Sequence, residues 1–136
     1  MALYYDNMDW FSIRKYRSAT LGGEALLVSA LDNGKRTQWL ADRVKLEGGR
    51  PVYLRLTIQE RESQFSWSYD GENYQDIGPV YDTSKLSDEY CSQYGEFTGT
   101  MVGIFCEDRM FRRHCADFDF FEYVAEEWNA DTSKRK

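Results

Sequence analysis

Two aspartates near the end of the chain come closest to the spacing of a catalytic pair. Asp117 and Asp119 alternate with Phe118 and Phe120, and residues two apart on a strand share a face with Cα atoms about 6.5–7 Å apart. Carboxyl groups can hydrolyse a sugar acetal only when they flank the bond from opposite sides. Both aspartates would come from one side. We therefore expect the phenylalanines to fill the core and the aspartates to face water, loop amides or a neighbouring domain rather than to act in catalysis.

The only histidine and the three cysteines form no obvious metal or nucleophile site. His114 has no adjacent Ser or Cys that it could activate, so we expect a polar loop residue. The cysteines lack the CxxC spacing that presents two thiolates to one zinc ion; they are Cys91, Cys106 and Cys115. Asp70, Asp117 and Asp119 could bind calcium, but no spaced loop of oxygen ligands is evident. We assign no metal ligands and no cofactor.

Aromatic side chains make up 16% of the chain, and they leave two interpretations open. The rings could form a platform on which a sugar stacks, or they could fill a core, which is the commoner role of Trp and Tyr. The rings in question are Tyr4, Tyr5, Trp10, Trp39, Trp67 and Tyr69. The arginines at 109, 112 and 113 leave a similar choice between a solvated loop and a surface that docks another domain.

The elements that must position these residues have a period of two, which predicts strands. Residues 51–80 predict a three-stranded antiparallel meander, because alternating apolar runs are separated by turns such as Asp70-Gly71. One short helical turn is predicted near 83–90, with Asp82, Thr83 or Ser84 as its cap. Further strands are predicted over 10–17, 24–31, 35–46 (one long strand or a pair), 100–108 and 115–123. This pattern indicates an all-β antiparallel sandwich or barrel.

Length and charge limit the remaining choices. A chain of 136 residues predicts one domain, which we place at 1–125, followed by a polar tail at 126–136. The formal charge of −6 disfavours nucleic acid and anionic membranes as partners. The sequence has no apolar run long enough to span a membrane and no signal peptide pattern. The odd number of cysteines favours a reducing, cytoplasmic location.

Three stretches resemble a known module in their order and spacing. They are GPVYDTSKLSDEY, EFTGTMVGIFCEDR and ADFDFFEY. They are similar to the C-terminal concanavalin A-like domain of glycoside hydrolase family 43 β-xylosidases and arabinofuranosidases. ALYYDNMDWFSIR, PVYLRLTIQ and FSWSYDGENYQDIG add to the resemblance, which covers residues 2–123. It implies a concanavalin A-like jelly roll.

The resemblance implies a non-catalytic accessory module, because the family's catalytic carboxylates lie in a separate β-propeller. The module would pack on that propeller and help to wall its pocket for xylo- or arabino-oligosaccharides. Phe97 matches the family's FTG phenylalanine, and Met101 stands where many relatives have a ring. Arg112 and His114 are further expected pocket-wall or domain contacts. The alternatives are an independent carbohydrate-binding module and a remnant structural domain.

The resemblance also implies that the module is incomplete at its N-terminus. The family's domain usually begins some tens of residues before the strand that ALYY matches. A sandwich without its first strands exposes apolar surface and a strand edge. We therefore expect self-association. The sequence leaves the identity of the sugar, the oligomeric state and the presence of calcium open.

Overall fold

The computed structural model describes residues 1–91 and 99–125 of the chain. They fall into two compact units, Met1–Phe105 and Cys106–Lys136. The division lies inside the 1–125 module that the sequence predicts, and each unit is taken by itself below. The predicted tail at 126–136 lies outside the described residues.

The larger sheet of the first unit has six antiparallel strands. Their order is β4-β3-β2-β1-β9, and β5 pairs with β3 beyond the end of β4. The strands are β1 (Ala2–Asp6), β2 (Asp9–Ser18), β3 (Gly23–Asp32), β4 (Lys35–Gln38), β5 (Val44–Lys45) and β9 (Met101–Gly103). A 3₁₀ turn, η1 (Leu40–Asp42), separates β4 from β5, so the predicted strand at 35–46 is a pair.

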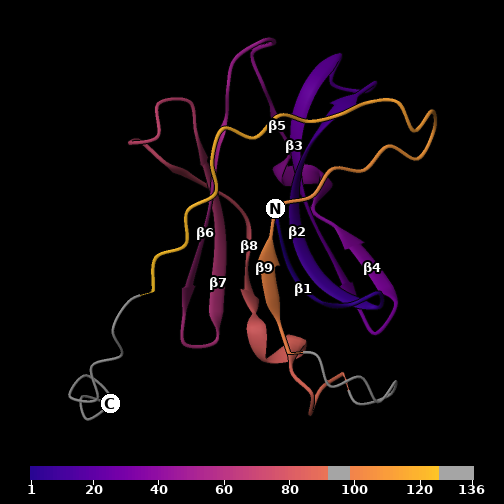
Figure 1. Cartoon of the computed structure of the whole chain (residues 1–136), viewed down its shortest axis with the longest axis vertical. Coiled ribbons are helices and arrows are strands. Elements are labelled where there is room, and N and C mark those ends of the chain that lie inside the picture. The colour runs from indigo at the N-terminus through magenta and orange to yellow at the C-terminus, as the bar shows by residue number, and fades with distance from the viewer. Residues whose placement is uncertain (92–98, 126–136) are drawn as a thin grey trace. The chain divides into compact units, whose positions relative to one another are not determined.

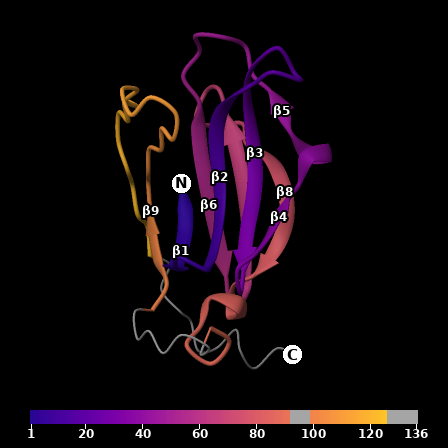
Figure 2. The same ribbon diagram turned by 90° about the vertical axis from the view of Figure 1, so that its right-hand side faces the viewer.

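The smaller sheet is the predicted three-stranded meander. It consists of β6 (Tyr53–Gln59), β7 (Glu62–Ser68) and β8 (Gln75–Asp82), in that order and antiparallel. The predicted helical turn is also confirmed, as the 3₁₀ helix η2 (Thr83–Leu86). The Asp82 side chain accepts a hydrogen bond from the Ser84 amide at 2.9 Å, which caps this helix. Figures 1 and 2 show the two sheets as facing layers.

Aromatic rings join the two layers. Phe11 of β2 is fully buried, and its ring centroid lies 4.4 Å from that of Tyr81 and 4.6 Å from that of Phe65. Trp39 meets Phe11 edge-on at 6.1 Å. Around these rings lie further buried side chains of both sheets, among them Leu3, Ile13, Leu26, Val28, Trp67 and Ile77. The sandwich prediction is therefore confirmed.

Two predicted strands differ in the structure. The strand expected over 100–108 is reduced to β9. The strand expected over 115–123 does not form, since this segment pairs with no strand in the part of the chain that the structure describes. Phe118 and Phe120 are 47% and 62% exposed, so the expectation that they fill the core was wrong. Alternation sets which side chains share a face, but a strand also needs a neighbour for its backbone hydrogen bonds.

A bulge in β8 brings its backbone against the larger sheet. The register between β7 and β8 shifts opposite Gln64, whose side-chain amide donates to the carbonyls of Ile77 and Gly78 at 3.1 and 3.3 Å. Gly78 has a φ of +72°, and a Cβ there would lie 2.9 Å from the side chain of Val28. Val28 is buried and stiff at χ1, so it cannot move aside.

Replacement of Gly78 by alanine should therefore destabilise the sandwich. The left-handed backbone costs a residue with a Cβ about 1–2 kcal/mol, and forcing a methyl into a packed interface adds about 1–3 kcal/mol. Gly22→Ala is the matched control, because Gly22 has a φ of +68° but open space around its Cβ position. Urea unfolding should show a larger loss for Gly78→Ala than for Gly22→Ala. Equal losses would contradict the close contact with Val28.

Candidate functional site

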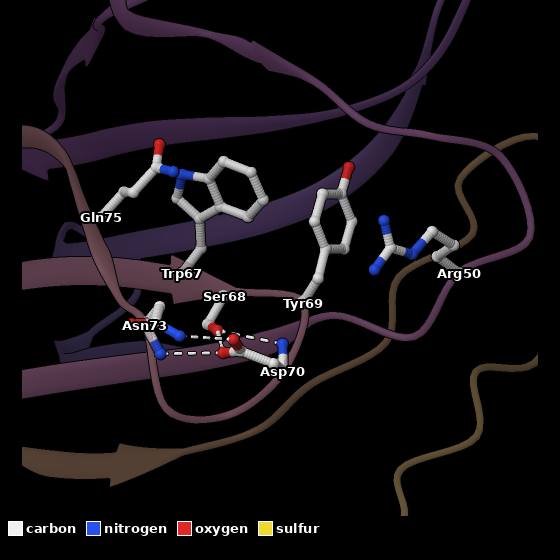
Figure 3. A pocket seen from close by; sticks show the side chains of 7 residues that line it. All are labelled: Arg50, Trp67, Ser68, Tyr69, Asp70, Asn73 and Gln75. Carbon is white, nitrogen blue, oxygen red and sulfur yellow. Dashed lines mark hydrogen bonds between the residues drawn. The ribbon is translucent and has the colours of Figure 1, made fainter.

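A pocket of about 280 Å³ opens in the first unit where β7 ends and β8 begins. Figure 3 shows the seven side chains that line it. They are Arg50, Trp67, Ser68, Tyr69, Asp70, Asn73 and Gln75. Most of the lining comes from one strand and the turn that follows it, with Arg50 contributed by the loop between β5 and β6.

Strand alternation and register place the pocket's wall. Phe65 and Trp67 point to the core, so Tyr69 continues the same face just beyond the end of β7. The Trp67 and Tyr69 rings meet at 88° with centroids 5.0 Å apart. Gln75 is the cross-strand partner of Trp67, so its side chain belongs to the same face. The pocket therefore combines two rings with an exposed amide.

The turn beneath the pocket is organised by Asp70. Its carboxylate accepts hydrogen bonds from the Ser68 hydroxyl at 2.6 Å, from the Glu72 amide at 2.9 Å and from the Asn73 amide at 2.8 Å. The Asn73 side chain donates to the other carboxylate oxygen at 2.7 Å. These bonds, led by that from Ser68, hold the pKa of Asp70 well below its usual value. Asp70 is therefore an ionised structural anchor.

Arg50 covers one side of the pocket. Its guanidinium lies 4.0 Å from the centroid of the Tyr69 ring, and it pairs with Glu47 at 2.8 Å. The Tyr69 hydroxyl in turn accepts a hydrogen bond from the Glu47 amide at 2.9 Å. The loop between β5 and β6 is thus tied to the end of β7.

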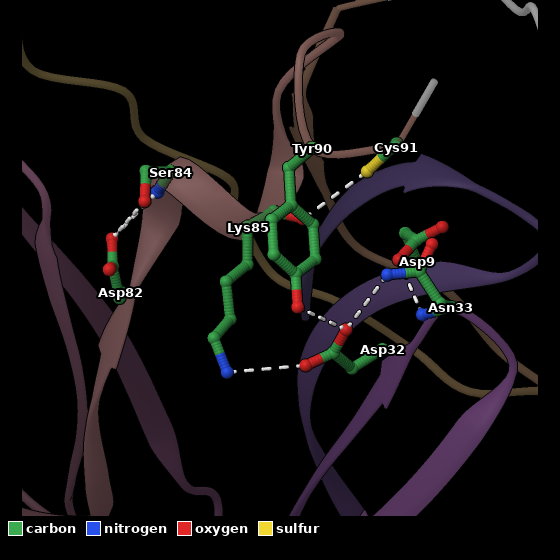
Figure 4. Close-up of polar contacts among 8 residues, drawn as sticks. All are labelled: Asp9, Asp32, Asn33, Asp82, Ser84, Lys85, Tyr90 and Cys91. Carbon is green, nitrogen blue, oxygen red and sulfur yellow. Dashed lines mark hydrogen bonds and ion pairs between the residues drawn. The ribbon is translucent and has the colours of Figure 1, made fainter. Parts of the chain in front are cut away.

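A polar network lies beyond the other end of β8 (Figure 4). Asp32 accepts from the Tyr90 hydroxyl at 2.8 Å and from Lys85 at 3.2 Å. Burial raises the pKa of Asp32, but the bonds from Tyr90 and Lys85 outweigh it and lower the pKa overall. The buried Cys91 thiol donates to the Lys85 carbonyl at 3.2 Å, and burial raises its pKa to about 12. Cys91 is therefore no activated nucleophile.

Asp9 is the least satisfied member of this network. It is fully buried, and one carboxylate oxygen accepts from the Asn33 amide at 2.7 Å. The other oxygen, Oδ2, has no hydrogen-bond partner among the described residues. Burial raises the pKa of Asp9 despite the bond from Asn33. No group of three or more His, Cys, Asp or Glu side chains in residues 1–91 and 99–125 is arranged to hold a metal ion.

The residues that the sequence nominates for the site lie in different places. Phe97 lies outside the described residues. Met101 is 56% exposed in β9 of the first unit. Arg112 and His114 are exposed in a loop of the second unit, which Asp108 organises. Its carboxylate accepts from the amides of Met110, Phe111, Arg113 and His114 at 3.0–3.1 Å, and these bonds lower its pKa.

The other candidate residues from the sequence analysis also lie in different parts of the structure. Tyr5 and Trp67 are buried in the core, Trp39 and Tyr69 pack partly against it, and Tyr4 is 37% exposed. Trp10 is half-buried in β2. The candidates between positions 106 and 119 are exposed in the second unit; they are Asp117, Asp119, Arg109, Arg113, Cys106 and Cys115. Cys106 and Cys115 are free thiols. Arg109 pairs with Glu107.

Sequence reasoning missed Arg50, Asn73 and Gln75. The sequence offers Trp67 and Tyr69 as candidate rings for sugar stacking and predicts a turn at Asp70-Gly71. It does not predict that these residues line one pocket. An alternating aromatic run that ends directly in an Asp-Gly-x-Asn turn was the available signal. No sequence signal indicates Arg50, because it reaches the pocket from a loop that lies 17 or more positions before the other lining residues.

The comparisons with known proteins all identify xylosidases as relatives. Residues 1–124 match the family described as "Beta xylosidase C-terminal Concanavalin A-like domain". The β-xylosidase of Bacillus subtilis is 30% identical over 121 residues, which are 88% of this chain and 22% of that protein. Xylosidase/arabinosidase 43B of Humicola insolens is 41% identical over 83 residues, which are 59% of this chain and 15% of that protein.

A solved structure agrees with the sequence matches. The xylan β-1,4-xylosidase of Bacillus halodurans superposes with a TM-score of 0.66 at 27% identity, over 73% of this chain and 19% of that one. The chain thus spans less than a quarter of these relatives. In the described residues, no helix is both long and apolar enough to cross a membrane.

Asp9 and Asp32 give a test in which the two substitutions change stability in opposite directions. Because the folded-state pKa of Asp9 is raised, its ionisation destabilises the fold as the pH rises above the unfolded value of about 4. Asp9→Asn removes that charge and should stabilise the chain at neutral pH by about 1 kcal/mol. The gain should shrink below about pH 4, where both states of the wild type are protonated.

Asp32→Asn is the matched control, because the pKa of Asp32 is lowered and its charge stabilises the fold above the unfolded value. This variant should lose stability at neutral pH. Urea unfolding across the pH range measures both effects. A loss of stability at neutral pH in Asp9→Asn as large as that in Asp32→Asn would contradict the unsatisfied state of Asp9.

Proposed function

We propose, from the premise that the chain belongs to the family of C-terminal concanavalin A-like domains of β-xylosidases, that it serves as a docking module for a catalytic domain. The family match covers nearly all of the chain, and the chain corresponds to the non-catalytic domain of enzymes about four times its length. The partner would be a glycosidase propeller acting on xylo- or arabino-oligosaccharides.

An exposed apolar row on the larger sheet carries this proposal. Tyr4 of β1 lies opposite Trp10 of β2 and opposite Met101 of β9, so the three side chains share one face. Their neighbours Leu3 and Phe11 point into the core, so that face is the outer one. Tyr4 and Met101 are 37% and 56% exposed.

The row continues along the chain beyond β9. Ile104 and Phe105 are 41% and 38% exposed. The Arg14 guanidinium lies 5.7 Å from the Trp10 ring and 6.0 Å from the Phe105 ring. Aromatic, methionine and arginine side chains are the types enriched where proteins bind one another. The row supports a protein partner on this face.

A domain exchange tests the docking role. This chain replaces the matching C-terminal part of the Bacillus subtilis β-xylosidase, and hydrolysis of nitrophenyl β-xyloside is measured. The exchanged enzyme should be active, while the same enzyme without its C-terminal part should not. Met101→Ala should lower kcat/KM about fivefold, or about 1 kcal/mol, because the contact with the catalytic domain is weakened.

Met110→Ala is the control, since Met110 is 81% exposed but lies outside the row. It should leave kcat/KM unchanged. The proposal would be overturned if the two substitutions had equal effects. It would also be overturned if the exchanged enzyme were inactive although circular dichroism showed that both of its parts are folded. Hydrolysis by the unfused chain alone would contradict the non-catalytic role.

Self-association is a second part of the proposal. The segment 115–123 has the alternation of a strand, and Phe118, Phe120 and Tyr123 are 47%, 62% and 72% exposed. A segment that alternates as a strand does and exposes phenylalanines can pair with another chain. The free thiols Cys106 and Cys115 support a reducing, cytoplasmic location for the parent protein.

The association should depend on those phenylalanines. Light scattering at micromolar concentration should give a mass above that of one chain, and replacing Phe118 and Phe120 together by aspartate should reduce it to one chain. Phe111→Asp is the control, because Phe111 is 62% exposed, as Phe120 is, but lies outside the segment. A wild-type chain that is monomeric under these conditions would contradict self-association.

A further inference from the structure

We propose that the pocket beside Asp70 binds a single neutral sugar ring, through Trp67, Gln75, Asn73 and Arg50. This inference goes beyond the docking role and does not rest on it, because the pocket lies on the smaller sheet and is lined by no residue of the exposed apolar row. The ligand class follows from which groups the pocket offers and which are already engaged.

The uncommitted polar groups of the pocket are both donors and acceptors. The Trp67 indole N–H and the Gln75 side-chain amide make no hydrogen bond with any described residue. Asn73 donates its side-chain N–H to Asp70, which leaves its carbonyl oxygen as an acceptor. Arg50 uses one nitrogen for Glu47 and keeps further N–H groups. Hydroxyl groups, which both donate and accept, match such a mixed set.

The charges of the pocket argue against an ionic ligand. Arg50 is its one cation among the lining residues, and it is already paired with Glu47. An anion would also meet the carboxylate of Asp70. A metal ion would have to displace hydrogen bonds, since Asp70 already accepts from Ser68, Glu72 and Asn73. The pocket is thus built for a neutral molecule.

The shape and the rings argue for a sugar rather than a long polar chain. The volume of about 280 Å³ lies just below the range of drug-sized pockets, which indicates a small ligand. Trp67 and Tyr69 meet at 88°, so they form a corner of apolar surface rather than a flat wall. A sugar ring has C–H groups that contact aromatic surface and hydroxyls at its rim. Figure 3 shows the amides of Gln75 and Asn73 and the guanidinium of Arg50 around this corner.

NMR titration of the full isotope-labelled chain with D-xylose and L-arabinose tests the inference. The chain has four tryptophans, and each gives one indole N–H signal. The Trp67 signal, assigned as the one lost in Trp67→Phe, should shift saturably, and those of Trp10 and Trp39 should not. At least one sugar should bind with a dissociation constant in the millimolar range, because a monosaccharide buries little surface.

Gln75→Ala should weaken this binding about fivefold, because it removes a donor and an acceptor to hydroxyls. Gln59→Ala is the matched control, since Gln59 is also an exposed glutamine at a strand end of the smaller sheet. It should leave the titration unchanged. Both substitutions are at the surface, so circular dichroism should show the native fold.

The inference is overturned if neither sugar shifts the Trp67 signal, or if Gln75→Ala and Gln59→Ala titrate alike. It is also overturned if inorganic phosphate at matched ionic strength shifts Trp67 more than the sugars do, since that result indicates an anion site. The domain-exchange assay measures hydrolysis and how it depends on a residue of the exposed apolar row. Its outcome therefore tests the docking role independently of sugar binding in the pocket.

Discussion

The stacking of Phe11 against rings of the smaller sheet is the contact on which the rest of the first unit depends. In the part of the chain that the structure describes, the two sheets share no backbone hydrogen-bond ladder, so packing between them holds them face to face. Phe11 lies within 4.6 Å of both Phe65 and Tyr81, measured between ring centroids. Such pairs contribute about 0.5–1.5 kcal/mol each beyond the burial of their surface. The separation of the layers is therefore set by aromatic thickness.

The separation of the two layers also determines the contacts that residues at both ends of β8 make. The strand is held against β3 by the bulge at Gly78, where the backbone packs on Val28. From this fixed centre, Gln75 reaches the pocket at one end and Asp82 caps η2 at the other. η2 in turn carries Lys85 to Asp32. A shift of the sheets relative to each other would disturb the pocket and the polar network together.

Much of the first unit could be predicted from the sequence because its signals are local. Alternation in residues 51–80 and the Asp70-Gly71 turn predict the strands of the meander and the faces that they bury without reference to distant residues. The 3₁₀ helix η2 follows from Asp82 and its bond to the Ser84 amide. These features can be predicted without information about the structure of the larger sheet.

The features that escaped prediction are those set by distant parts of the chain. Residues 115–123 alternate as a strand does, yet they pair with no strand of the described chain. The backbone at the Gly78 bulge packs against Val28, which lies fifty residues earlier in the chain. Arg50 enters the pocket because its guanidinium stacks on Tyr69, a contact with no sequence pattern of its own. Pairing across such separations is invisible to a reading based on periodicity.

The geometry of the first unit also separates its two proposed roles. The exposed apolar row of Tyr4, Trp10 and Met101 lies on the outer face of the larger sheet, whereas the pocket opens at the end of the smaller one. Between them stands the packed core around Phe11, which is too dense to deform gradually. The pocket and the row share no residue, so a ligand in the pocket and a protein on the outer face would not compete for the same side chains. A sandwich of this kind can be held by a protein on one sheet while it holds a sugar on the other.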